Sequence, residues 1–329
     1  MKKVLILKGC AGLGNRLITL ASAIEYANIT NRTLFVDWSD GQFSIEGINA
    51  FNIHFELKNV KSVYELKKSD LENKSIYPNT LGKENLEQPF YNLYASNGGL
   101  TLNRFRKIIP TRGKFSRLHE HWAPIHKTKV QTLKNTIASV FTDSFLELGG
   151  RLSYNLPEDI VIFADHIPAF NPLLLRKHIT LNSTTSSLVE CHWKEKFEGK
   201  FVIGVHVRWS DKKPLGKLEK LHQLIETIRS KESYIYLATD NLEIQNEFIF
   251  KYSKFIKTET NLPELPSNIG LHSYAKESKN KDLIENSFKE SILDMWLLSK
   301  CNILIAQEGS TFSLISSVLK NEAKNTFFW

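Results

Sequence analysis

The amino-acid sequence predicts an α/β protein with two Rossmann-like domains that face each other across a cleft. One observation is the start of the chain. An apolar run at 4–7, a glycine turn, an apolar helix at 16–28 and a second apolar run at 33–38 follow the order of a βαβ unit. The other observation is a second series of apolar runs and amphipathic segments that begins near Gly199.

This second series continues to the C-terminus. Continuous apolar runs predict buried strands, and apolar residues three or four apart predict helices. The predicted strands are 201–207, 233–239 and 302–306, and the predicted helices are 217–231, 242–252, 288–301 and a last one from Thr311. We expect the polar segment 257–281 to be a long loop with one short strand. Residues 40–195 predict no clear topology, and we therefore expect the domains to be 1–195 and 196–329.

The composition is that of a folded protein, with 42% hydrophobic and 24% charged residues. No apolar run approaches the 18 residues of a membrane span, and the run at 4–7 is too short for a signal peptide. We therefore expect a cytoplasmic protein. Three scattered cysteines indicate neither a disulfide framework nor a metal cluster, and we expect no metal.

The formal net charge is +8, and much of it lies in one stretch. Between residues 104 and 134, nine Lys and Arg residues stand against a single acid, Glu120. Such a stretch suits an anionic membrane surface, to which the protein would bind peripherally, or a polyanionic substrate. A solvated basic face without a specific partner is an equal alternative. Nucleic acid is not expected, because no binding motif accompanies the charge.

A glycine-rich turn follows the first strand. Gly12, Gly14 and Asn15 lie where a strand passes into a helix, and glycines there let a backbone approach a phosphate at the helix N-terminus. Asp37 ends the second strand, as a dinucleotide-binding fold would require. Leu17 occupies a position where that fingerprint needs glycine or alanine. A tight turn without a ligand remains an alternative.

His206 and Arg208 stand at the carboxyl end of the strand 201–207, which is where ligands bind to open α/β sheets. Residues two apart project to the same side of a strand, and an arginine fork grips phosphate oxygens. A structural ion pair between Arg208 and Asp211 is the alternative.

Three further positions carry polar groups near predicted strand ends. Asp294 lies within an apolar helix; it either faces solvent or, if buried, suits the N–H donors of a guanine base. Ser310 and Thr311 follow a strand and either cap the next helix or bind a phosphate there. Asp240 ends the strand 233–239.

Together these segments resemble the α1,6-fucosyltransferases, which include the bacterial nodulation fucosyltransferase and the animal enzyme that core-fucosylates N-glycans. The resemblance covers residues 5–38 and about 200–320. Its segments are KGCAGLGNRL with LASAIEYANITNRTLFVDW, then GVHVRWSDK, SYIYLATDN and SFKESILDMWLLSKCNILIAQEGSTFS.

The resemblance implies a GT-B-type fold, a GDP-fucose donor, no metal requirement, an acceptor-side N-terminal domain and a donor-binding C-terminal domain. Arg208 would bind the donor β-phosphate. The further donor contacts that it implies are the backbone at Gly12 and Gly14, the Ser310 hydroxyl, the guanine-reading pair His206 and Asp294, and Asp240 near the donor. The family's glutamate base falls by direct counting on Gly216 and, with a short insertion, on Glu219.

We therefore expect an inverting, metal-independent transferase that moves fucose from GDP-fucose to a hydroxyl of an oligosaccharide or glycolipid. Arg208 would stabilise the leaving group, and Glu219 or Asp211 would act as the base. The alternatives are a transferase related to α1,2- or protein O-fucosyltransferases, an NAD-dependent oxidoreductase that uses the glycine turn, and a non-catalytic nucleotide-sugar or glycan-binding protein.

Overall fold

The computed structural model describes residues 3–9, 11–77, 156–163, 171–211, 214, 216–257, 262, 269–320 and 322–329. The chain divides into two compact units, Met1–Leu181 and Asn182–Trp329. The expected boundary at 195/196 falls at the end of helix α10 (Ser183–Lys196), which belongs to the second unit. Among the described residues, no helix has the length and apolarity needed to cross a membrane.

The first unit contains a five-stranded sheet with parallel neighbours throughout. In spatial order its strands are β4 (Ser62–Val63), β2 (Thr33–Asp37), β1 (Val4–Lys8), β6 (Ile160–Phe163) and β5 (Ile76–Tyr77). Strands β3 (Phe55–Leu57) and β7 (Ile179–Leu181) form a separate antiparallel pair. The strand that opens the chain therefore lies at the centre of the parallel sheet.

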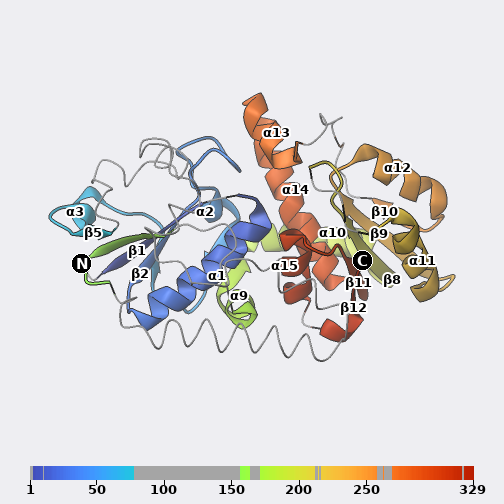
Figure 1. The fold of residues 1–329 in the computed structure, drawn as a ribbon, viewed down its shortest axis with the longest axis horizontal. Coiled ribbons are helices and arrows are strands. Elements are labelled where there is room, and N and C mark those ends of the chain that lie inside the picture. The colour runs from blue at the N-terminus through green and yellow to red at the C-terminus, as the bar shows by residue number, and fades with distance from the viewer. Residues whose placement is uncertain are drawn as a thin grey trace. The chain divides into compact units, whose positions relative to one another are not determined.

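Helix α1 (Leu13–Ile29) follows β1 and runs alongside β1 and β2 (Figure 1). All side chains of β1 are buried, and Val4 and Ile6 pack against β6 through Ile160 and Ile162. Among the described residues of this unit, the other helices are α2 (Ala50–His54), α3 (Lys68–Leu71) and α9 (Pro172–His178). The predicted βαβ start is confirmed, with the helix beginning three residues earlier than expected because Gly12 is its N-cap.

The second unit also contains a five-stranded parallel sheet. In spatial order its strands are β10 (Phe255–Lys257), β9 (Ser233–Thr239), β8 (Phe201–Val207), β11 (Ile303–Ala306) and β12 (Thr326–Phe328). From β8 the chain moves outward to β9 and β10, and then returns to the other side of β8 for β11 and β12. The direction of winding reverses between β8 and β11, so the carboxyl ends of these two strands border a topological switch point.

Helices cover both faces of this sheet (Figure 1). On one face, Ile203 and Val205 of β8 share a core with α11 (Leu218–Ile228) and α12 (Leu242–Lys251). On the other face, α14 (Lys281–Lys300) packs on β8 and β9 and contacts α15 (Thr311–Leu319). This layering confirms the predicted α/β class for the second unit.

The structure corrects the prediction for the polar segment 257–281. It contains helix α13 (Leu271–Ser278), and α14 begins at Lys281, seven residues before the predicted start. Asn280 caps α14, because its side chain accepts a hydrogen bond from the backbone N–H of Leu283. The apolar periodicity that guided the prediction is absent from this polar first part of the helix. Strand β12, near the C-terminus, was not predicted either.

Gly204 lets α14 approach β8 closely. A Cβ atom at this position would lie 2.9 Å from the sulfur of Cys301 and 3.0 Å from a methyl group of Leu298. Both neighbours are fully buried, so neither can move aside without repacking the core.

We therefore expect Gly204→Ala to lower the free energy of unfolding by about 1–3 kcal/mol through overpacking. Urea denaturation measures this change. Combining Gly204→Ala with Cys301→Ala should recover part of the loss, because the shorter side chain makes room for the new methyl group. Strictly additive losses in the double variant would contradict this account of the contact.

Candidate functional site at the strand ends

The second unit gathers polar side chains at the carboxyl ends of β8, β9 and β11. Arg208 directly follows β8, Asp240 directly follows β9, and Gln307 directly follows β11. Gln307 accepts a hydrogen bond from the backbone N–H of Arg208 through its side-chain oxygen, at 2.6 Å. This contact joins the ends of β8 and β11 across the switch point.

Arg208 forms an ion pair with Asp211. Its Nε donates to Oδ1 at 2.6 Å and its Nη2 donates to Oδ2 at 2.5 Å. The side chains are 25% and 22% exposed, so the pair lies at the surface of the unit rather than in its core. The structure thus shows the pairing that the sequence left open, and it shows an arginine that solvent can reach.

Asp240 holds the loop that carries this pair. Its Oδ1 accepts hydrogen bonds from the backbone N–H groups of Trp209, at 2.7 Å, and Ser210, at 3.2 Å. Its Oδ2 accepts a hydrogen bond from the Ser210 hydroxyl. The predicted donor-binding residue Asp240 is therefore a loop anchor in this structure.

His206 is buried beneath the same loop. Its Nδ1 lies 2.7 Å from the hydroxyl oxygen of Ser313, which also accepts the backbone N–H of Gln307. The ring stacks on Phe312 with a centroid distance of 4.7 Å. Burial, with a smaller contribution from the Arg208 cation, lowers the pKa of His206 to about 3, so the ring is neutral at physiological pH.

Asp294 lies on α14 and contacts β9. Its Oδ1 accepts a hydrogen bond from the hydroxyl of Tyr236 at 2.6 Å. Burial raises the pKa of Asp294 to about 7 and outweighs this hydrogen bond, which lowers it; the Glu290 carboxylate adds to the rise. Asp294 therefore changes its charge near neutral pH.

Two predicted groups lie at helix starts. Ser310 is the N-cap of α15, and its hydroxyl accepts the backbone N–H of Ser313. The capping alternative is thus present in the structure. Thr311 is the first residue of α15, at the helix end whose N–H groups attract anions. Glu219 is exposed on the first turn of α11, and no described contact joins it to Arg208.

In the first unit, the glycine turn packs around Arg16. This buried side chain donates from Nε to the carbonyl oxygen of Ala11 at 2.9 Å. Ala11 has a φ of 61°, a region that residues with a Cβ rarely adopt. A Cβ atom at Gly9 would overlap the Arg16 guanidinium, which explains the need for glycine there. Gly12 has room for a Cβ and serves as the N-cap.

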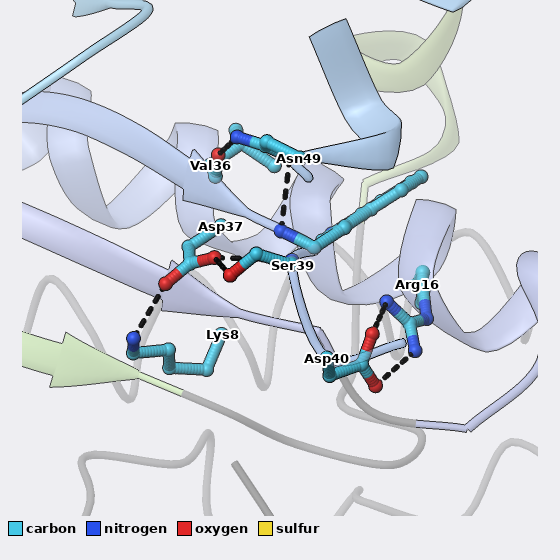
Figure 2. Close-up of polar contacts among 8 residues, drawn as sticks. Lys8, Arg16, Val36, Asp37, Ser39, Asp40 and Asn49 are labelled. Carbon is cyan, nitrogen blue, oxygen red and sulfur yellow. Dashed lines mark hydrogen bonds and ion pairs between the residues drawn. The ribbon is translucent and has the colours of Figure 1, made fainter. Parts of the chain in front are cut away.

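Arg16 also forms an ion pair with Asp40, as Figure 2 shows. Its two terminal nitrogens donate to the carboxylate of Asp40 at 3.0 and 2.6 Å. The guanidinium also faces the rings of Trp38 and Phe43. The predicted residues Gly14 and Asn15 lie in the first turn of α1 and are both buried. The turn is therefore fixed by a charge pair shielded from solvent.

The carboxylate of Asp37 already has partners within the protein. Its carboxylate pairs with buried Lys8 at 2.5 Å and accepts hydrogen bonds from the backbone N–H and the hydroxyl of Ser39 (Figure 2). A dinucleotide-binding fold needs this carboxylate for the hydroxyls of a ribose. These contacts argue against the oxidoreductase alternative.

Sequence reasoning did not identify Gln307, Ser313 or Tyr236 as parts of the site. Gln307 and Ser313 lie on either side of Ser310 and Thr311, which were considered for phosphate binding, and a polar residue directly after a strand was a usable signal. Tyr236 is 58 residues from its partner Asp294, and no sequence pattern connects them. Among the described residues, no group of three His, Cys, Asp or Glu side chains is placed to hold a metal ion.

Two parallel sheets, each with polar clusters at its strand ends, define an α/β protein with two Rossmann-like units. No model of a known protein family matches the sequence, and no curated protein sequence matches it. Solved structures do match. NodZ α1,6-fucosyltransferase soaked with GDP-fucose is 18% identical, with a TM-score of 0.60 over 97% of this chain and 93% of that one.

The same enzyme co-crystallised with GDP is 17% identical, with a TM-score of 0.60 over the same shares of the two chains. The structure of fucosyltransferase NodZ from Bradyrhizobium is also 17% identical, with a TM-score of 0.57 over 97% of this chain and 94% of that one. This chain therefore has the fold of these enzymes. The predicted GT-B-type α/β class is confirmed.

We expect Asp40→Asn to lower the free energy of unfolding by about 3–5 kcal/mol, because it leaves the buried Arg16 guanidinium without a counter-charge. Chemical denaturation followed by circular dichroism measures the loss. Glu232→Gln, which removes one partner of the exposed Lys254–Glu232 pair, is the control and should cost far less. Equal losses in the two variants would show that burial of the first pair is energetically unimportant.

Proposed function

We propose that this protein is an inverting, metal-independent glycosyltransferase that transfers fucose from GDP-fucose to a hydroxyl group of a glycan. The observation that carries the proposal is the partly exposed guanidinium of Arg208 at the switch point of the second sheet. The fold shared with NodZ, solved with GDP-fucose and with GDP, supports this donor. In this proposal the second unit binds the donor and the first unit serves the acceptor.

His206 and Asp294 are the proposed contacts for guanine. A guanine base offers an N–H and an amino group on one edge, and an ionised carboxylate accepts both. Tyr236 holds one oxygen of Asp294, which fixes the orientation of the carboxylate. The pKa of His206, near 3, keeps its ring neutral, so it can contact a base without adding charge.

Arg208 is the proposed stabiliser of the leaving group. In the reaction, the bond between fucose C1 and the diphosphate oxygen breaks, and the electron pair stays on the diphosphate. The acceptor oxygen bonds to C1 from the opposite face, which inverts the configuration, and its proton passes to a base. A cation directed at the developing charge can replace a metal ion, and Ser310 and Thr311 at the start of α15 would add hydrogen-bond donors.

Glu219 is the proposed base. Both carboxylate oxygens of the other candidate, Asp211, accept hydrogen bonds from Arg208, so a proton taken up by Asp211 would remove the charge that holds the proposed leaving-group cation. Glu219 is exposed at the start of α11 and does not carry this restriction.

The acceptor is proposed from charge. The basic stretch 104–134, which suits an anionic or lipid-linked oligosaccharide on the cytoplasmic side of a membrane, lies outside the described residues. A screen of oligosaccharides with GDP-fucose, read by mass spectrometry, identifies the acceptor. The same screen with other GDP-linked sugars tests the choice of fucose.

We expect Arg208→Ala to lower turnover of GDP-fucose by about 10²–10³-fold, because the leaving group loses its main cationic contact. The initial rate of GDP release measures this effect. The thermal unfolding midpoint should change little, because the side chain is partly exposed. Arg229→Ala is the matched control, since Arg229 forms an exposed pair with Glu226 with the same spacing as the Arg208–Asp211 pair. Turnover like that of the wild type in Arg208→Ala would reject the assignment.

We also expect GDP-fucose binding to weaken as the pH falls. The pKa of Asp294 is about 7, and guanine needs its ionised form, so protonation below pH 7 removes the binding-competent state. The dissociation constant should rise about tenfold between pH 8 and pH 6. The diphosphate of GDP-fucose is esterified at both ends and keeps its charge in this range. Calorimetry measures the trend, which Asp294→Asn should abolish; an unchanged slope in that variant would show that another group titrates.

A further inference from the structure

The ion pair between Arg208 and Asp211 uses one particular edge of the guanidinium. The bonds come from Nε and Nη2, which is the side-on geometry, and they occupy two of the five N–H donors of the group. The remaining donors are both hydrogens of Nη1 and one of Nη2. No described residue accepts a hydrogen bond from Nη1. The end of the guanidinium thus keeps donors for an anion while its side is held.

The loop around this pair is fixed from two neighbouring strands. Gln307, after β11, holds the backbone N–H of Arg208, and Asp240, after β9, holds the N–H groups of Trp209 and Ser210. The backbone on which Asp211 stands is therefore tied to the sheet. A carboxylate on such a backbone can fix the plane of a long and otherwise flexible arginine side chain.

We propose that Asp211 is a positioning residue for Arg208, and that it directs the Nη1 end of the guanidinium toward the diphosphate of a nucleotide-sugar. This inference rests on the proposed function, in which Arg208 stabilises the leaving diphosphate. It gives Asp211 a role other than that of the base, because a proton taken up by Asp211 would remove the charge that holds Arg208. Asp211 orients the Arg208 guanidinium before the reaction, so the entropy of ordering this side chain does not add to the activation free energy.

The proposal predicts a specific kinetic change in Asp211→Asn. Asparagine keeps one acceptor oxygen and loses the charge that fixes the fork. We expect the rate of GDP-fucose hydrolysis, measured without any acceptor, to fall about tenfold at saturating donor. The dissociation constant for GDP should change less than threefold, because loss of the negative charge near the diphosphate offsets the looser arginine. Asp211→Glu, which keeps the charge, should retain more activity than Asp211→Asn.

A double-variant experiment separates positioning from independent chemistry. In the Arg208→Ala background, Asp211→Asn should cause no further loss of hydrolysis, because the group that it orients is already absent. Glu226→Gln, in the matched exposed pair on α11, should leave both the rate and GDP binding unchanged. Thermal unfolding of each variant establishes that the proteins compared are folded.

Three results would overturn the proposal. An equal loss from Asp211→Asn with and without Arg208 would make Asp211 an independent catalytic group. Unchanged hydrolysis in Asp211→Asn would remove its role in donor activation. Tighter GDP binding with an unchanged rate would make Asp211 only a competitor for the arginine. If the wild-type protein neither binds GDP nor hydrolyses GDP-fucose, the proposed function itself fails, and this result is distinct from the other three.

Discussion

The hydrogen bonds that the loop after β8 donates to the Asp240 carboxylate are the contacts on which the candidate site depends. The backbone N–H groups that follow the end of a strand no longer form hydrogen bonds with neighbouring strands. Where water cannot reach them, a side chain must accept their hydrogen bonds. Asp240 accepts two of these groups and a hydroxyl. The orientation of Arg208 follows from this anchor, because the backbone under its ion pair cannot swing away from the sheet.

Two titratable groups of the second unit, His206 and Asp294, have unusual pKa values. His206 is neutral because burial lowers its pKa to about 3, and the nearby Arg208 cation adds a smaller effect in the same direction. Asp294 is close to half-protonated at pH 7, because burial on α14 disfavours its charge and one hydrogen bond from Tyr236 offsets only part of that effect. Perturbed pKa values of this kind cluster at functional sites. A buried group that pairs with a ligand is costly to keep charged while the ligand is absent.

Much of this arrangement could be read from the sequence, and the reasons for the misses are physical. The strands β1, β8 and β11 are buried on both faces, so each is a continuous apolar run. The polar helix α13 and the first turns of α14 lack this pattern. The Arg208–Asp211 pair was a recognised alternative because the residues are three apart. Arg16 and Asp40 are 24 residues apart, and only the folded turn brings them together.

Two arginine–aspartate ion pairs of the protein, Arg16–Asp40 and Arg208–Asp211, have the same chemistry but differ in exposure. Arg16, in the first turn of α1, and Arg208, directly after β8, each bind a carboxylate through two hydrogen bonds. The Arg16 side chain is 0% exposed, so its charge can only stabilise the turn that it holds. Arg208 is 25% exposed and held by its side, which leaves N–H donors at the end of the guanidinium that solvent can reach. Access to solvent, rather than the presence of a counter-ion, therefore separates the structural arginine from the one proposed to act in the reaction.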